Sequence, residues 1–265
     1  MAVAAVPSCS ELDIVVVSLA AAEERRARVE RMMAEVPWRW RFFDARTQPP
    51  PSLPYDAERA VIEKGRTLSP AELACFASHY DLLRGFAEGG GAEYMLVLED
   101  DVHVDPNFWF ASLPELMRRG GIDMLRLYAR FLHRSRHVAR ISDRHSVVRF
   151  RRQVFGTQAY VVSREGARRL TAPIRKVVRP CDDEFDRFWK NRVPLYALFP
   201  FPVLELEGRS TIHGRGPQTF ELTRRQTALR QIFRRTTKLR RVLADKRLKA
   251  RDRAVAARLR GAHFG

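Results

Sequence analysis

Three adjacent carboxylates, Glu99, Asp100 and Asp101, follow directly on the apolar run at residues 95–98. Four consecutive apolar residues predict a strand that is buried on both faces. Adjacent acids at the end of such a strand repel one another and are costly to desolvate, and a bound divalent cation would neutralise them. Ligands also collect at the carboxyl ends of strands in open α/β sheets. The residues alone leave two interpretations open, a metal site and an acidic, solvated turn.

The elements expected to position these acids begin with a strand, a helix and a second strand at residues 13–19, 20–35 and 38–43. This order is typical of a parallel α/β sheet. Ser69 as N-cap and Pro70 in the first turn predict a further helix, which leads into the acid-terminated strand. The chain is therefore expected to have an α/β fold.

Several shorter elements are predicted after and between these. Helices are expected at residues 57–64, 106–119, 164–172 and 182–190. Strands are expected at residues 122–128, 157–163 and 195–206. Prolines break the last of these strands and therefore predict that it lies at an edge of the sheet. Residues 46–66 are expected to form a loop around a short helix, and the basic residues 130–153 are expected to be exposed with little structure.

The positive charge of the chain is concentrated at its C-terminal end. The formal net charge of the 265 residues is +17, and residues 222–265 hold 15 Lys/Arg against 2 Asp/Glu, which leaves +4 for the rest. Apolar side chains recur there at helical spacing: Leu229, Ile232, Phe233, Leu239, Val242 and Leu243. We therefore expect an N-terminal extension at 1–12, one domain at 13–221 and a basic amphipathic helical tail at 222–265.

Three interpretations of the basic tail remain open. It suits an anionic membrane surface, it suits nucleic acid, and it is also compatible with a solvated, partly disordered segment. We expect the membrane surface as partner and regard nucleic acid as unlikely.

The cysteines Cys9, Cys75 and Cys181 fit neither a zinc motif nor a disulfide framework, so Cys75 and Cys181 are expected in the core. The first residues lack the basic region of a signal peptide, and no run approaches the length of a membrane span. We therefore expect a cytoplasmic protein that is peripheral at the inner face of the membrane.

Seven stretches resemble, in the same order, glycosyltransferase family 25, the lipooligosaccharide galactosyltransferases whose relatives also modify collagen. They are VVVSLAAAEERRARV at 15–29, FFDA at 42–45, LSPAELACFASHY at 68–80, LVLEDDV at 96–102, LRL at 125–127, GTQAYVVS at 156–163 and PCDDEF at 180–185. The chain departs from the family at Ser18, where the family has asparagine, and at Ala71 and Ala74, where it has glycine.

The resemblance implies a GT-A-like nucleotide-sugar-binding fold, with a mixed, mostly parallel sheet flanked by helices. It also implies an inverting transfer from a UDP-sugar, with UDP-galactose as the expected donor and Mn²⁺ (or Mg²⁺) as cofactor. The acceptor would be a lipopolysaccharide, a lipooligosaccharide or another surface glycan or glycolipid.

The same resemblance implies roles for individual residues. The metal would be bound by Asp101, Glu99 and His213, and the donor by Ser18, Leu19, Arg25, Ser78, His79, Glu99, Asp100 and Arg126. Four of these assignments have a structural alternative of their own: a buried hydrogen bond for His79, an exposed helix face for Arg25, a carboxylate pair for Arg126 and an inert loop residue for His213.

Inversion needs a carboxylate that takes the proton of the acceptor hydroxyl. Asp182 stands where the family has an acid, with Asp183 and Glu184 as neighbouring candidates, and helix capping is the alternative role of Asp182. Two other functions stay open. One is a nucleic-acid-binding protein driven by the basic tail. The other is an inactive glycosyltransferase-like scaffold, which the departures at Ser18, Ala71 and Ala74 would allow.

Overall fold

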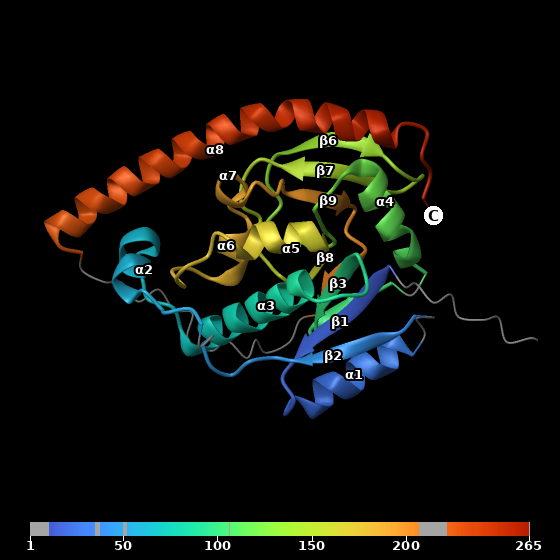
Figure 1. The fold of residues 1–265 in the computed structure, drawn as a ribbon, viewed down its shortest axis with the longest axis horizontal. Helices are drawn as coiled ribbons and strands as arrows, with labels where there is room; N and C mark the ends of the chain where they lie inside the picture. The colour runs from blue at the N-terminus through green and yellow to red at the C-terminus, as the bar shows by residue number, and fades with distance from the viewer. Residues whose placement is uncertain (1–10, 35–37, 50–51, 106, 207–221, 265) are drawn as a thin grey trace, which may run out of the picture.

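A computed structural model describes residues 11–34, 38–49, 52–105, 107–206 and 222–264 (Figure 1). Its centre is one mixed sheet of eight strands. In chain order these are β1 (Leu12–Ser18), β2 (Trp40–Asp44), β3 (Tyr94–Glu99), β5 (Met124–Arg126), β6 (Ser135–Arg140), β7 (Ser146–Phe150), β8 (Ala159–Ser163) and β9 (Tyr196–Phe199). A separate pair is formed by β4 (Val102–Val104) and β10 (Val203–Glu205).

Helices cover both faces of the large sheet. They are α1 (Glu23–Met33), α2 (Ala57–Lys64), α3 (Pro70–Glu88), α4 (Leu113–Gly120), α5 (Arg164–Thr171), α6 (Cys181–Phe185), α7 (Phe188–Asn191) and α8 (Arg224–Leu259), with a 3₁₀ turn at Phe110–Ser112. Side chains of β1 alternate between two cores: Ile14 and Val16 pack with α1, α4 and the end of α8, whereas Val15 and Val17 pack with α3, α5 and α6. The predicted mixed sheet flanked by helices is confirmed.

The strand order β2-β1-β3-β8-β5-β9-β7-β6 places several strand ends at one edge. β1 runs parallel to β2 and to β3, with Val17 opposite Glu99. β8 runs antiparallel to β3, with Ala159 opposite Leu98, so the start of β8 lies beside the end of β3. Residues from three parts of the sequence therefore meet where β3 ends.

The cap predicted for the long helix is present. The Ser69 hydroxyl accepts from the Glu72 amide at 3.2 Å, and the Glu72 carboxylate accepts from the Ser69 amide at 3.0 Å. Arg66 also donates to both oxygens of Glu72, at 2.6 and 2.7 Å. Reciprocal capping satisfies two amides that the helix itself leaves unpaired, and it fixes where α3 begins.

Residues 130–153, which were expected to have little structure, instead form β6 and β7. The prediction was wrong because the basic side chains of this segment have partners far along the chain. Arg149 is fully buried on β7 and donates to Asp252 of α8 at 2.7 Å, and it lies 2.9 Å from Asp245. A buried arginine is stable when carboxylates pair with it in this way.

Two further expectations are corrected. The region 195–206 is broken as predicted, but β9 lies inside the sheet between β5 and β7 and is not an edge strand. The helix expected over 182–190 is divided into α6 and α7, and the one expected over 106–119 begins its α-helical part at Leu113, with Pro106 outside the described residues.

The basic C-terminal segment forms one helix of 36 residues, α8, which lies along the β6 side of the sheet (Figure 1). Val255 and Leu259 are buried in the core shared with α1 and α4. The second half of α8 is therefore part of the folded body. None of the helices in the described ranges is both long and apolar enough to cross a membrane.

The buried pairing between β7 and α8 predicts a large stability effect. Arg149→Ala would leave Asp245 and Asp252 buried beside fewer cations, so we expect a loss of about 3–5 kcal/mol of unfolding free energy in urea titrations. The control is Arg136→Ala, since Arg136 is 40% exposed and lies 3.4 Å from Asp252. It should cost less than about 1 kcal/mol. Equal losses in both variants would contradict the prediction.

Candidate functional site

A cavity of about 360 Å³ opens at the carboxyl ends of β1 and β3. This volume is within the usual range of small-molecule sites. The structure brings most of the predicted site residues to its wall: Ser18, Leu19, Arg25, Ser78, His79, Glu99, Asp100, Asp101 and Asp182. Ala71 and Ala74 also line it.

Asp100 is held by groups from β1 and α1. The Ser18 hydroxyl donates to Asp100 Oδ2 at 2.7 Å, and Arg25 donates to Oδ1 at 2.9 Å. Arg28 donates to the Asp100 carbonyl at 2.8 Å. Serine at position 18 therefore keeps a hydrogen-bond donor, which is also what an asparagine amide would offer. Asp100 is thus a satisfied anion that ties the start of α1 to the end of β3.

Glu99 contacts α3 and the start of β8. Its Oε1 accepts from the Thr157 hydroxyl at 2.5 Å and lies 3.3 Å from His79 Nε2, while His79 Nδ1 lies 3.0 Å from the Tyr160 hydroxyl. Burial opposes the charge on Glu99, but the contacts with His79 and Thr157 outweigh it and lower the pKa of Glu99. Glu99 is therefore ionised at neutral pH.

Asp101 differs from its two neighbours. Its Oδ1 is buried and has no hydrogen-bond partner in the described part of the chain. Burial, together with the charges of Glu99, Asp100 and Glu205, raises the pKa of Asp101 to about 7. An unpartnered buried carboxylate oxygen among other acids fits a hard divalent cation, because oxygen ligands and negative charge are what such ions require.

Glu205 is a site residue that the sequence analysis missed. β10 pairs antiparallel with β4, with Glu205 opposite Val102, which brings Glu205 to the cavity wall with Asp101. Arg130 and Gln158 donate to Glu205 Oε1 at 3.1 and 3.2 Å, and the Tyr128 hydroxyl donates to Oε2. The available signal was the same as for Glu99, an acid at the end of an apolar run.

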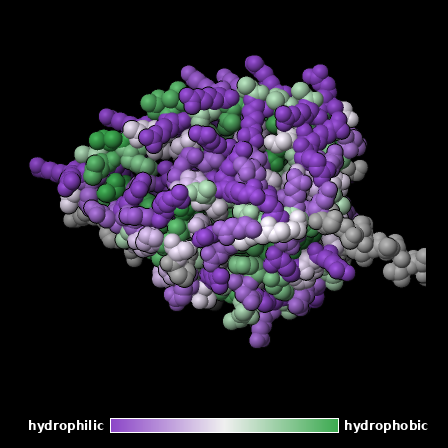
Figure 2. Space-filling model, viewed as in Figure 1, coloured by the Kyte–Doolittle hydropathy of each residue, from purple (hydrophilic) through white to green (hydrophobic). Residues whose placement is uncertain are grey.

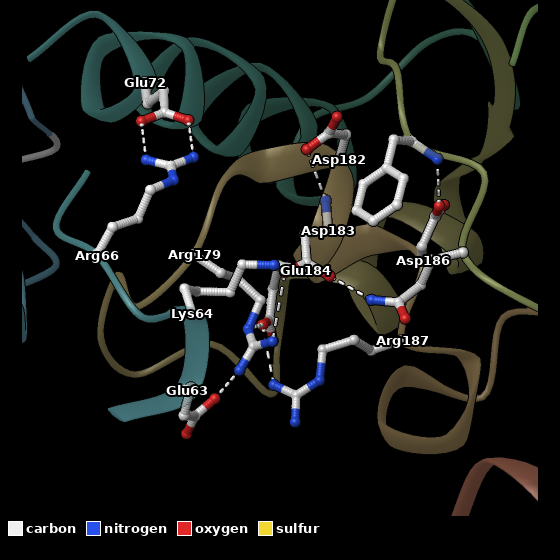
Figure 3. A network of polar contacts seen from close by, with 12 residues as sticks. Glu63, Lys64, Arg66, Glu72, Arg179, Asp182, Asp183, Glu184, Asp186 and Arg187 are labelled. Carbon is white, nitrogen blue, oxygen red and sulfur yellow. Dashed lines mark hydrogen bonds and ion pairs between the residues drawn. The ribbon is translucent and has the colours of Figure 1, made fainter. Parts of the chain in front are cut away.

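Asp182 lies in the first turn of α6, and both of its carboxylate oxygens accept backbone amides. Oδ2 accepts from Gly156 at 2.9 Å. Oδ1 accepts from Asp183 at 2.7 Å (Figure 3). Gly156 has a φ of +84°, and a Cβ there would lie 2.5 Å from Gln158 Oε1, so the position requires glycine. The N-cap of α6 is Pro180, so Asp182 is not the cap residue.

The neighbouring acids Asp183 and Glu184 do not line the cavity. Asp183 is buried and accepts from Lys64 at 2.6 Å, and Glu184 lies 2.9 Å from Arg179 Nε (Figure 3). Burial raises the pKa of Asp183, but Lys64 and Arg179 outweigh this and lower it overall. Of the three acids in this run, only Asp182 faces the cavity.

Arg126 is also absent from the cavity wall. It is fully buried and donates to Asp186 and to the Gly156 carbonyl. Arg126 therefore pairs with a carboxylate, which was the structural alternative to a donor-binding role. Asp186 also accepts the amides of Val154 and Phe155, at 2.7 and 2.8 Å. This buried pair fixes the loop whose Gly156 amide contacts Asp182. His213, the remaining predicted ligand, lies outside the described residues.

A second cavity adjoins the first and shares Arg25 and Asp101 with it. Arg28 and Arg31 of α1 also line it, together with the acid Glu24 of the same helix. Arginines gathered in this way favour an anionic group, because a guanidinium matches the geometry of phosphate and carboxylate oxygens.

The comparison with known families agrees with this geometry. The family model described as glycosyltransferase family 25 (LPS biosynthesis protein) matches residues 11–185. The chain belongs to glycosyltransferase family 25. Membership implies a glycosyltransferase of lipopolysaccharide biosynthesis, with a sugar donor and a glycan acceptor. The matched range of this family member includes every cavity residue from Ser18 to Asp182, whereas Glu205 and α8 lie beyond it.

The raised pKa of Asp101 predicts a pH-dependent stability effect. In chelator-treated protein, Asp101→Asn should raise the Tm at pH 8 by about 2–4 °C per kcal/mol of repulsion relieved. The gain should shrink as the pH falls from about 7 toward 4, because native Asp101 is then already protonated. Asp100→Asn is the control and should lower the Tm, since Asp100 pairs with Arg25 and Ser18. A drop in both variants at pH 8 would contradict the prediction.

Proposed function

We propose that this family member transfers galactose from UDP-galactose, with inversion, to a lipopolysaccharide or lipooligosaccharide acceptor, with Mn²⁺ (or Mg²⁺) bound at Asp101. The observation that supports this most is the buried, unpartnered Asp101 Oδ1 among the acids of the cavity. Glu99 and Glu205 lie at the same wall and would complete the oxygen ligands, with His213 a further proposed ligand.

The donor requires charge compensation at its diphosphate. A bound divalent cation supplies this by neutralising the leaving phosphates. Arg25 contributes a fixed guanidinium, which Asp100 holds at 2.9 Å between the two cavities. Ser18 and Leu19 form the adjacent wall, and Ser78 accepts the Arg46 amide at 2.8 Å, which fixes the loop after β2 beside the cavity. These residues would orient a nucleotide-sugar, and their hydrogen bonds hold them in place before the reaction begins.

Asp182 is the proposed base. In the inverting step the acceptor oxygen forms a bond to the anomeric carbon as the bond to the diphosphate breaks, and the hydroxyl proton passes to the Asp182 carboxylate. Two backbone amides donate to the Asp182 carboxylate and fix its direction. The buried Arg126–Asp186 pair supports this role indirectly, because it holds the loop that carries the Gly156 amide.

The same proposal includes contact with the inner face of the membrane, where lipid-linked acceptors would be presented. Apolar side chains of α8 are exposed on the helix face away from the body: Leu229, Ile232, Leu239, Val242 and Leu243. Figure 2 shows apolar patches among hydrophilic side chains at the upper left, where the first half of α8 lies. An exposed apolar face with flanking arginines suits anionic lipid, with about 1 kcal/mol per nearby cation.

Nucleic-acid binding uses the same positive charge but gives no role to these apolar side chains or to the acidic cavity. The inactive scaffold gives no role to Asp101. Both rivals therefore leave a specific observation unexplained, and the experiments below separate them from the proposal.

The enzyme proposal predicts metal-dependent turnover. With a panel of UDP-sugars and a lipooligosaccharide acceptor, UDP release should require Mn²⁺ or Mg²⁺, stop with chelator and be lost in Asp101→Ala. Asp182→Asn should lower kcat by about 10²–10⁴-fold, the usual contribution of a positioned base. Asp105→Asn is the control, because Asp105 is exposed and lies outside the cavity wall. Absence of turnover with every donor would favour the scaffold.

The membrane proposal predicts a loss of liposome binding in an α8 variant. Ile232→Ser combined with Leu239→Ser should weaken binding to anionic liposomes by about 10²–10⁴-fold, since each buried side chain contributes about 1.5–3 kcal/mol. Leu132→Ser is the control, because Leu132 is 67% exposed and lies in the loop between β5 and β6, outside α8. Deleting α8 is unsuitable, since Val255 and Leu259 are core residues. Unchanged liposome binding with salt-dependent RNA or DNA binding would support the nucleic-acid rival instead.

A further inference from the structure

A cysteine, a histidine and a glutamate meet at the cavity wall between α3 and β3. Their ligand atoms, one each from Cys75, His79 and Glu99, all lie within 4.8 Å of one another. Cys75 and His79 are four residues apart on α3 and therefore project from the same helix face. Glu99 is the last residue of β3, which is close to this face of α3. The fold thus brings together three side-chain types that bind transition metals.

The distance between His79 and Glu99 matches that between two ligands of a tetrahedral ion. Nitrogen and oxygen ligands lie about 2.0–2.1 Å from Zn²⁺, which places two such ligands about 3.3–3.4 Å apart in a tetrahedron. His79 Nε2 and Glu99 Oε1 are 3.3 Å apart. A zinc-bound sulfur lies about 2.3 Å from the ion, which places it about 3.5 Å from the other two ligand atoms in a tetrahedron, and the three ligand atoms here lie within 4.8 Å of one another.

Groups behind the ligands hold them in the direction that metal binding requires. Histidine ligands usually place their second ring nitrogen against a hydrogen-bonding partner, which fixes the tautomer. His79 Nδ1 lies 3.0 Å from the Tyr160 hydroxyl, which leaves Nε2 facing Glu99. The Thr157 hydroxyl likewise donates to Glu99. His79 is 1% exposed, so its ring is fixed by packing as well.

We propose that Cys75, His79 and Glu99 bind a borderline-soft divalent ion of the Zn²⁺ class, at a position next to the carboxylate cation site proposed at Asp101, which also uses Glu99. Thiolate and imidazole favour zinc, whereas carboxylates favour manganese and magnesium, so the two positions select different ions. Binding replaces the thiol proton of Cys75 with the metal and releases that proton to solvent. The inference does not depend on the proposed function, because it concerns metal binding and not turnover.

The position of the three ligands also indicates that one coordination position of the ion would be open to the cavity. All three line the cavity, so the fourth coordination position faces the space where a substrate would lie. A site with three protein ligands and one open position is typical of zinc that meets a substrate or water. Because Glu99 is also a proposed ligand of the cation at Asp101, zinc bound here would share the Glu99 carboxylate with that cation.

The test measures metal binding directly. The protein is prepared in a Cys9→Ser background, because Cys9 lies outside the described residues, and is reduced with a phosphine, stripped with chelator and dialysed against Zn²⁺ or Co²⁺. We expect about one equivalent of zinc by elemental analysis. Co²⁺ should give a thiolate-to-cobalt charge-transfer band in the near ultraviolet. Cys75→Ala should abolish the band and weaken Zn²⁺ binding by about 100-fold or more, since loss of a supporting residue alone costs 10–100-fold.

Two variants control for the rest of the cavity. Cys181→Ala should keep the band, because Cys181 lines the cavity but is not among the three ligands. Asp101→Asn should also keep it, while losing Mn²⁺ binding. Circular dichroism of each variant checks its fold, and alanine suits the helical position of Cys75. No retained zinc, a band that persists in Cys75→Ala, or a band lost in Asp101→Asn would each overturn the proposal.

Discussion

The structure depends on how it holds several carboxylates together where β3 ends. Like charges in a partly buried cavity repel, and each needs a compensating group. Asp100 has Ser18 and Arg25, Glu99 has His79 and Thr157, and Glu205 has Tyr128 and Arg130. The partners come from β1, α1, α3 and the segments around β8 and β5, so the acids also connect these elements. Asp101 keeps a buried oxygen without such a partner, and this uncompensated charge is what makes the site suitable for a cation.

The same physical problem recurs away from the cavity and is solved by arginine. Arg179 lies among Glu63, Asp183 and Glu184, and Lys64 reaches Asp183, so α2 and α6 are joined by a buried ionic network (Figure 3). A helix as short as α6 has little stability of its own. The network therefore positions α6 and its cavity-facing carboxylate, Asp182, while the neighbouring acids serve the scaffold. Acidic side chains that are adjacent in sequence thus have different roles because they face different surroundings.

Much of the framework could be predicted from local patterns. The apolar runs of β1 and β3, the alternation of the two cores and the capping box at Ser69 follow from short-range periodicity and hydrogen-bond chemistry. The predictions failed where a side chain is paired with a distant residue. The basic segment around Arg149 was expected to be exposed because its partners Asp245 and Asp252 are about 100 residues away. Glu205 was missed for the same reason, since only the β4–β10 pairing brings it to the cavity.

By itself, the sequence determined that acids would stand at the end of a buried strand and that the chain resembles one glycosyltransferase family. Both follow from residue types at short spacing. Only the tertiary structure decided which acids are compensated, because compensation depends on the partners that other elements bring within hydrogen-bond distance. The tertiary structure places Asp182 at the cavity wall and Asp183 in a contact with Lys64. It pairs Arg126 with the buried Asp186. In the described part of the cavity, Asp101 is the acid with a buried oxygen that has no hydrogen-bond partner.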